Sequence, residues 1–156
     1  MIAQYEGLSL VSRVIRWRTR STVSHTAWIR RDGRVCEAWT KDGVRITANL
    51  SARHTPGTPV RVYRLKDFTD EQWDAMDKWT EAQCGKPYDY RSVWRFMTLK
   101  PATENGKWFC SELVTHGLRS IGYPILNGEP HLLSPRDVGL SPLLIWDRDR
   151  RTYAGE

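Results

Sequence analysis

The stretch KWFCSELVTHGL, residues 107–118, carries the strongest indication of both fold and chemistry in this chain. Cys110 stands where an aromatic pair gives way to a sequence typical of a helix, which Gly122 would close. A cysteine in the first turn of a helix lies near free backbone N–H groups and the positive end of the helix dipole, and both favour the thiolate. The same N–H groups could hold an oxyanion. The alternative interpretation is a buried packing residue, because an isolated cysteine is more often inert.

A nucleophilic thiol needs a base, and the chain has four histidines. His116 is six residues along the same predicted helix, which is a rise of about 9 Å and a rotation of about 240°, so it faces away from Cys110. His54 and His131 lie in loops that contain proline or glycine, which favours exposure to solvent. His25 opens a predicted strand, which is a rigid position for a base. We therefore predict that His25 is the base.

A third group should orient the imidazole, and Glu37 is the candidate in the returning strand of the predicted β-hairpin 25–40. The register of this hairpin determines whether the two side chains can meet. A two-residue turn at Asp32-Gly33 would place His25 and Glu37 on opposite faces of the hairpin.

A three-residue loop at 31–33 gives the other register, with Gly33 in the left-handed conformation. His25 and Glu37 then become diagonal neighbours on one face, roughly 7–8 Å apart at the backbone and within side-chain reach. The catalytic interpretation therefore predicts this loop, and it puts Cys36 on the other face as a packing residue.

The order of the predicted elements indicates an α+β domain. Amphipathic and alternating patterns, with their capping and turn residues, predict helices at 9–19, 69–84, 91–98 and 110–121, a short helix capped by Asp137, and strands at 25–31, 34–40, 43–50 and 60–65. The length of 156 residues suggests a single domain, 1–156. We expect residues 148–156 to form a frayed tail.

Composition excludes several classes of protein. Three cysteines without a CxxC motif argue against a disulfide framework and favour a reducing compartment. The longest apolar run near the start is interrupted by serines and arginines, so we expect no signal peptide or transmembrane segment and a cytoplasmic location, or release by a phage or by cell lysis. The spacings of cysteine and histidine match no common ligand pattern, so we predict no metal and no cofactor.

The net charge of +6 raises the question of an anionic partner. Arginines cluster at 13–20, 30–31 and 148–151. The simplest interpretation is a solvated basic surface, and the functional one is attraction to an anionic polymer or a membrane surface. No nucleic-acid fold signature is present, so we predict no specific nucleic-acid partner and a monomeric protein.

Four short segments in a fixed order carry a family resemblance. They are SHTAWI (24–29), EAW (37–39), GKPYDY (85–90) and WFCSELV (108–114). Together they resemble the circularly permuted branch of the NlpC/P60 papain-like superfamily, which includes YiiX-like proteins and lecithin:retinol acyltransferase-like enzymes. In ordinary NlpC/P60 enzymes the histidine follows the cysteine, whereas here it precedes both motifs. The segment SPRD (134–137) matches a YiiX-like S-P-x-D segment, and the overall style resembles small phage or prophage reading frames.

The resemblance implies a permuted papain-like fold, with an antiparallel sheet of about four or more strands packed on helices. It implies a cysteine peptidase or amidase that acts through a thioester, with Cys110 as nucleophile, His25 as base and Glu37 as orienting group. Residues expected to contact the substrate are Tyr88, Trp28 and Ser111.

Three functions stay open at this point. The first is hydrolysis of a peptide or a peptidoglycan fragment. The second is a lipid-directed acyltransferase or phospholipase A, which would use the basic N-terminal helix with its tryptophan at a membrane surface. The third is a non-catalytic basic binding module in which Cys110 is only a packing residue.

Overall fold

The computed structural model describes residues 1–90 and 107–153. The described elements, in chain order, are β1 (Ile2–Tyr5), α1 (Leu10–Thr19), β2 (His25–Ile29), β3 (Val35–Trp39), β4 (Gly43–Thr47), β5 (Pro59–Leu65), α2 (Asp70–Gln83), α4 (Cys110–Ser120), the 3₁₀ helix η1 (Pro130–Leu132), α5 (Pro135–Val138) and β6 (Leu144–Arg151). The strands form one six-stranded sheet in the order β4-β3-β2-β1-β5-β6, and every neighbouring pair is antiparallel. The α+β prediction is therefore confirmed. No helix in the described ranges has the length and apolar character needed to cross a bilayer.

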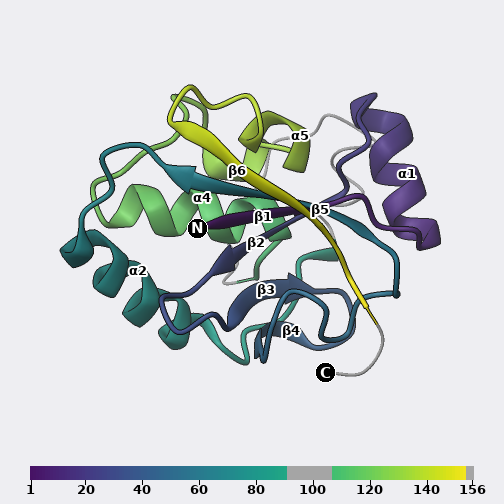
Figure 1. The fold of residues 1–156 in the computed structure, drawn as a ribbon, viewed down its shortest axis with the longest axis horizontal. Coiled ribbons are helices and arrows are strands. Elements are labelled where there is room, and N and C mark those ends of the chain that lie inside the picture. The colour runs from purple at the N-terminus through teal and green to yellow at the C-terminus, as the bar shows by residue number, and fades with distance from the viewer. Residues whose placement is uncertain (91–106, 154–156) are drawn as a thin grey trace.

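The sheet has a core on each face. On one face α4 packs against β2 and β3 and is itself in contact with α2, while β6 forms one edge of the sheet beside β5 and is drawn nearest the viewer in Figure 1. The larger core includes Trp28, Cys36 and Cys110 and lies on the helix side. The smaller core includes Ala27 and Ile29 and lies on the other side. Because side chains alternate along a strand, His25 projects from the face that faces away from α4.

The β2–β3 hairpin has the predicted register. Trp28 lies opposite Cys36, and the Arg30 N–H donates to the Arg34 carbonyl at 2.8 Å, which closes a three-residue loop. Gly33 has φ +83° and supplies the left-handed residue of this loop. Cys36 is fully buried in the helix-side core, as expected.

Capping residues account for the helix boundaries. The Thr69 hydroxyl oxygen accepts a hydrogen bond from the Gln72 backbone N–H, and the Gln72 side-chain oxygen accepts one from the Thr69 backbone N–H. Helix α2 therefore begins with a capping box. Gly122 has φ +79° directly beyond α4 and ends it as predicted. The predicted helix 91–98 lies outside the described residues.

Helix α1 forms as predicted but turns its apolar stripe outward. Ser9 caps it, and Ile15 is its buried residue. Leu10 and Trp17, which the helical spacing would place on a core-facing stripe, are 75% and 73% exposed. Arg13 and Arg20 are exposed beside them.

Two strands were not predicted from the sequence. β1 is four residues long and fully buried, whereas β6 is an edge strand with the charged sequence LIWDRDRR. β6 pairs with β5 as far as Arg151, and Thr152 behind it is buried. The expectation that the chain frays from residue 148 is therefore wrong, because backbone pairing and not apolar burial holds this strand in place.

Candidate active site

Cys110 is the first residue of α4, as the sequence predicted. The residue before it, Phe109, has an extended backbone conformation, and its N–H donates to the Glu112 carboxylate at 3.3 Å. This contact fixes where the helix starts. It leaves the backbone N–H groups of Cys110 and Ser111 in the first turn directed toward the sulfur.

The sulfur of Cys110 is buried, at 1% exposure for the residue. Burial raises the pKa of this thiol to about 12, although hydrogen bonds from the backbone N–H groups of Thr26, Ser111 and Cys110 itself act in the opposite direction. Cys110 is therefore a neutral thiol near pH 7 in this structure.

The hydrogen bond from Thr26 shows where the sulfur lies relative to the sheet. N–H groups two residues apart in an extended chain point to the same side. The bond from Arg30, just beyond β2, to Arg34, just before β3, therefore shows that Thr26 directs its N–H toward β3. Pairing between β2 and β3 covers only the end near the hairpin loop. At the other end α4 packs against both strands, and the Cys110 sulfur is near enough to the Thr26 N–H, on the residue that follows His25, for that group to lower the thiol pKa.

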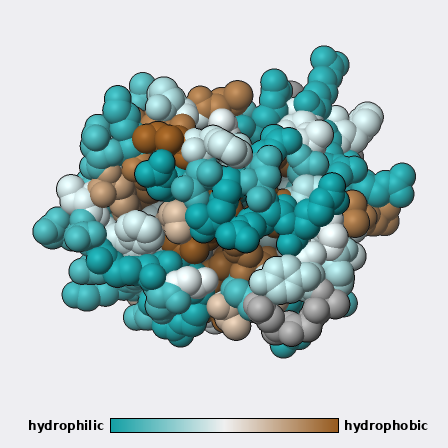
Figure 2. Space-filling model, in the orientation of Figure 1, coloured by the Kyte–Doolittle hydropathy of each residue, from teal (hydrophilic) through white to brown (hydrophobic). Residues whose placement is uncertain are grey.

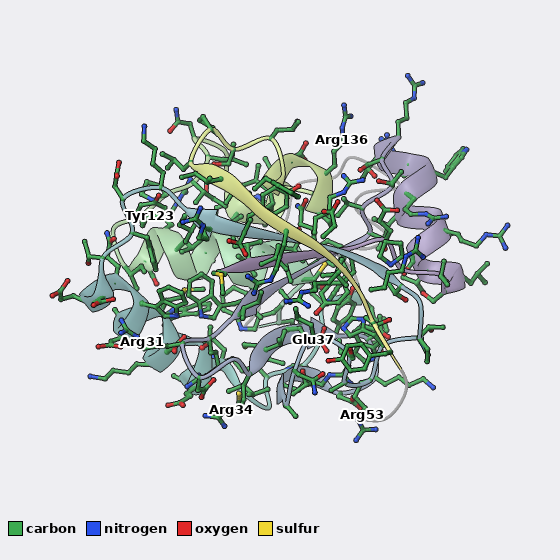
Figure 3. All side chains as sticks on the ribbon, in the orientation of Figure 1. Arg31, Arg34, Glu37, Arg53, Tyr123 and Arg136 are labelled. Atoms are coloured by element: carbon green, nitrogen blue, oxygen red, sulfur yellow. The ribbon has the colours of Figure 1, made fainter. Side chains whose placement is uncertain are left out.

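His25 and Glu37 meet between β2 and β3. The His25 Nε2 lies 2.7 Å from the Glu37 Oε2. The Arg45 guanidinium donates twice to the other carboxylate oxygen, Oε1, at 2.7 and 3.0 Å. Figure 3 shows Glu37 inside the molecule near β3, whereas the labelled Arg34 and Arg53 lie at its edge. Because Nε2 is engaged by Glu37, Nδ1 is the ring nitrogen of His25 left for a thiol proton.

A second histidine shares the same carboxylate. The His54 Nε2 lies 3.1 Å from the Glu37 Oε2, and its side chain is only 5% exposed. The ring stacks on Tyr5 with centroids 4.0 Å apart and an interplanar angle of 3°. The expectation that His54 is exposed is therefore wrong. The loop that contains it folds back over the sheet, where the Tyr5 hydroxyl donates to the Leu50 carbonyl at 3.2 Å.

The protonation states follow from these contacts. Burial lowers the pKa of His25 below its ordinary 6.5 and outweighs the favourable hydrogen bond that His25 donates to Glu37. Burial alone would raise the pKa of Glu37, but hydrogen bonds from His25 and His54 and the charges of these rings hold it well below its usual range. Near pH 7 the site thus combines a neutral thiol, a neutral imidazole and a carboxylate.

The residues predicted to contact substrate lie in packed positions. Trp28 is fully buried on the helix side, and its Nε1 donates to the Asp77 carboxylate at 2.7 Å. It cannot reach a substrate, which corrects that expectation. Ser111 is also fully buried, and its hydroxyl donates to the Leu133 carbonyl at 2.5 Å. Tyr88 is 6% exposed, packs against Phe109, and is near enough for Cys110 to influence its pKa.

His116 lies where helix geometry placed it, away from the sulfur. Its ring stacks against Trp79 and meets Trp108 edge to face, with centroid distances of 5.7 and 5.1 Å. This side of α4 packs toward α2 rather than toward β2 and β3.

The cluster of His25, Glu37 and His54 also has the composition of a metal site. One potential ligand atom from each residue lies within 4.8 Å of the others. Two imidazole nitrogens and a carboxylate oxygen are a donor set that suits zinc. Sequence spacing did not indicate this cluster, because the three residues come from two strands and a loop and follow no local ligand pattern.

Together these features define the class of fold. A helix that begins at a buried cysteine packs on an antiparallel sheet whose strands carry a His–Glu pair. No protein-family model matches the chain, and no curated protein matches it.

Among solved structures, the chain is similar to the crystal structure of the metalloprotein yiiX from Escherichia coli O157:H7, described as DUF1105. The TM-score is 0.73 and the sequence identity 20%, with 96% of this chain and 95% of that chain covered. At this identity the likeness establishes a shared fold. The predicted resemblance to YiiX-like proteins is confirmed to that extent.

Proposed function

We propose that the chain is a papain-like cysteine hydrolase that cleaves an amide bond through Cys110, His25 and Glu37. The observation that carries this proposal is the position of Cys110 as the first residue of α4, with the backbone N–H of Thr26, the residue that follows His25, close enough to lower the pKa of its thiol. The His25–Glu37 contact of 2.7 Å supplies the oriented base.

The chemistry begins from the neutral pair. The Nδ1 of His25 takes the thiol proton as the Cys110 sulfur attacks the carbonyl carbon, and the carbonyl oxygen becomes an oxyanion. The backbone N–H of Cys110 is part of the oxyanion hole. The imidazolium then donates its proton to the leaving nitrogen, the C–N bond breaks, and a thioester remains.

Water completes the cycle. His25 takes a proton from the attacking water, the C–S bond breaks, and the proton returns to the sulfur. Glu37 stays ionised throughout and holds the imidazole through Nε2, which leaves Nδ1 to exchange the thiol proton. The buried Arg45 contact keeps the carboxylate in place while it does so.

Peptides and peptidoglycan fragments are the substrates we propose. Wild type and Cys110→Ala should be compared on peptidoglycan fragments and on phospholipid, with a thiol-directed probe as competitor. We expect wild type to release new amino groups from the fragments and Cys110→Ala to release none.

The matched control is Cys84→Ser, because Cys84 is an exposed cysteine outside the site. It should leave turnover unchanged. Absence of cleavage of either substrate by a folded wild-type protein would favour the third possibility, a non-catalytic basic binding module.

A lipid ester is the second candidate substrate, and α1 is the observation that favours it. Leu10 and Trp17 are exposed on a helix whose cationic side chains include Arg13 and Arg20, an arrangement suited to an anionic bilayer surface. Vesicles with and without anionic lipid distinguish the substrates. Binding that requires anionic lipid, weakens with salt and is lost in Trp17→Ala would favour the lipid ester, whereas wild-type binding below detection would count against it.

A metal ion at His25, Glu37 and His54 is a second candidate use of the same residues. The structural neighbour is described as a metalloprotein, and the donor set present here fits a zinc ion. Arg45 occupies Oε1 of Glu37, so the metal would be held by Oε2 and by one nitrogen of each imidazole. A zinc ion supplies Lewis-acid chemistry when bound.

Thiol and metal chemistry compete for His25, and elemental analysis separates them. If the metal candidate holds, purified protein contains about one zinc per chain, and His54→Ala loses the zinc while Cys110→Ala keeps it. Protein free of metal that remains active in the presence of a chelator would reject a metal role.

A further inference from the structure

A cavity of about 360 Å³ lies on the face of the sheet that faces away from α4. Its apolar and aromatic wall is formed by Ile29, Leu50, Val60, Trp73 and Tyr153. The volume is in the range of small-molecule sites. Figure 2 shows the side of the molecule on which β6 is nearest the viewer in Figure 1. On this side, hydrophobic residues are visible between hydrophilic ones.

Five arginines supply the charged part of the wall. They come from two of the three basic clusters in the sequence, and they are Arg30, Arg31, Arg148, Arg150 and Arg151. Pairing within the sheet and the hairpin loop brings these distant segments together. No aspartate or glutamate is among the described residues that line the cavity.

Several of these guanidinium groups have unused capacity. Arg30 is only 6% exposed, and its side chain donates to the Glu81 carboxylate at 2.5 Å. Its Nε is buried without a hydrogen-bond partner, although it lies 3.6 Å from the Asp32 Oδ2. The Nε of Arg148 is also buried without a partner, although its Nη1 pairs with Asp147. Within residues 1–90 and 107–153, neither Arg150 nor Arg151 forms an ion pair with an acidic side chain. Buried donors without partners are unfavourable until a ligand or water satisfies them.

We propose that this cavity binds the phosphate group of a small ligand, whose apolar or aromatic part packs on Trp73 and the neighbouring apolar wall. Guanidinium forks match phosphate oxygens in a bidentate manner, and several of them together suit a group with more than one negative charge. The concave shape and the apolar wall favour a small molecule over an extended polymer.

The site does not depend on the proposed thiol chemistry. Ile29 is four residues from His25 on the same strand, which is a separation of about 13 Å. Cys110→Ala should therefore bind the ligand as wild type does, so failure of one proposal leaves the other standing.

Isothermal titration with phenyl phosphate and with inorganic phosphate tests the proposal. We expect one saturable site, with phenyl phosphate binding more tightly than inorganic phosphate because its ring can pack on the apolar wall. Arg150→Gln should weaken binding by roughly tenfold or more, since a charged hydrogen bond to the phosphate is lost. Arg18→Gln removes the same charge from α1, outside the cavity, and should leave affinity unchanged.

A second variant guards against misfolding. Trp73→Leu keeps an apolar wall and should reduce the preference for phenyl phosphate over inorganic phosphate, with circular dichroism confirming the fold. Absence of saturable phosphate binding, or equal losses in Arg150→Gln and Arg18→Gln, would overturn the proposal. Binding of a single-stranded oligonucleotide without binding of phenyl phosphate would overturn it in favour of a polymer surface.

Discussion

At the scale of single residues, one carboxylate organises the site. Glu37 is fully buried, accepts two hydrogen bonds from Arg45 and faces two imidazoles with its other oxygen. The sequence predicted its pairing with His25 only through the catalytic interpretation, which required the three-residue loop because the turn residues alone allowed two registers. It could not predict His54, because nothing in a Pro/Gly loop indicates which way the loop folds back.

The two histidines should differ in their effect on hydrolysis. His25→Ala removes the base and should lower kcat by about 10³-fold, within the range for loss of general base catalysis. His54→Ala leaves the His25–Glu37 contact in place and should lower kcat by roughly tenfold or less. Steady-state kinetics on the same substrate measure both. Equal losses would instead indicate that both imidazoles serve one metal ion.

The pH profile follows from the neutral pair. His25 must be unprotonated to accept the thiol proton, and burial lowers its pKa below 6.5, so kcat/KM should fall only as the pH drops below that value. The Cys110 thiol has a pKa of about 12, so no further change is expected up to about pH 9. A bell-shaped profile with a loss just above neutrality would point to a preformed thiolate–imidazolium pair and contradict this assignment.

At the scale of elements, caps and turns were predictable and edge strands were not. Thr69, Gly33 and Gly122 each act through a local hydrogen bond or a left-handed backbone, so their effect is visible in the sequence. β6 is rich in charged residues and is held by backbone pairing with β5. Its sequence therefore lacks the alternation of apolar and polar residues that predicts a strand. The exposure of the apolar residues Leu10 and Trp17 of α1 could not be predicted either, because helical spacing does not show which face of a helix packs on the core.

The segment GKPYDY is fixed to β4 by backbone contacts. Val44 donates to the Lys86 carbonyl at 2.8 Å, and Gly85 donates to the Val44 carbonyl at 2.9 Å. Gly43 stands beside them with φ +72°, and a Cβ there would lie 2.3 Å from the Lys86 carbonyl oxygen. The start of β4 therefore tolerates only glycine.

Two glycine substitutions separate backbone strain from this close approach. Gly57 has φ +82° and open space around it, so Gly57→Ala should lower the free energy of unfolding by about 1 kcal/mol through strain alone. Gly43→Ala adds a clash with backbone and should lower it by more than about 2 kcal/mol. Urea denaturation measures both. Equal changes would show that the Lys86 segment moves aside easily.

At the scale of the whole molecule, the proposed catalytic groups come from different layers. Cys110 belongs to the helix-side core and His25 to the opposite face of the sheet, and the pairing of β2 with β3 covers only their loop end. The order of motifs predicted which residues we propose for catalysis. How far this strand pairing extends is not revealed by the sequence.

The same whole-chain packing gathers the arginine clusters. Residues 30–31 and 148–151 are distant in sequence, and the antiparallel sheet brings them to one cavity. The net charge computed from the sequence shows that the protein is basic, but it does not show that these arginines line the same cavity.

The central claim is that the His25 imidazole activates the Cys110 thiol, and alkylation tests it without knowledge of the substrate. Cys84 must first be replaced by serine, because a hydrogen bond from Cys36 lowers the pKa of its exposed thiol to about 7 and it would react first. The rate of iodoacetamide labelling at Cys110 is then measured by peptide mass spectrometry at pH 7.5, with His25 present and in His25→Gln. We predict that His25→Gln slows labelling roughly tenfold or more. Equal rates in two folded proteins would contradict the account.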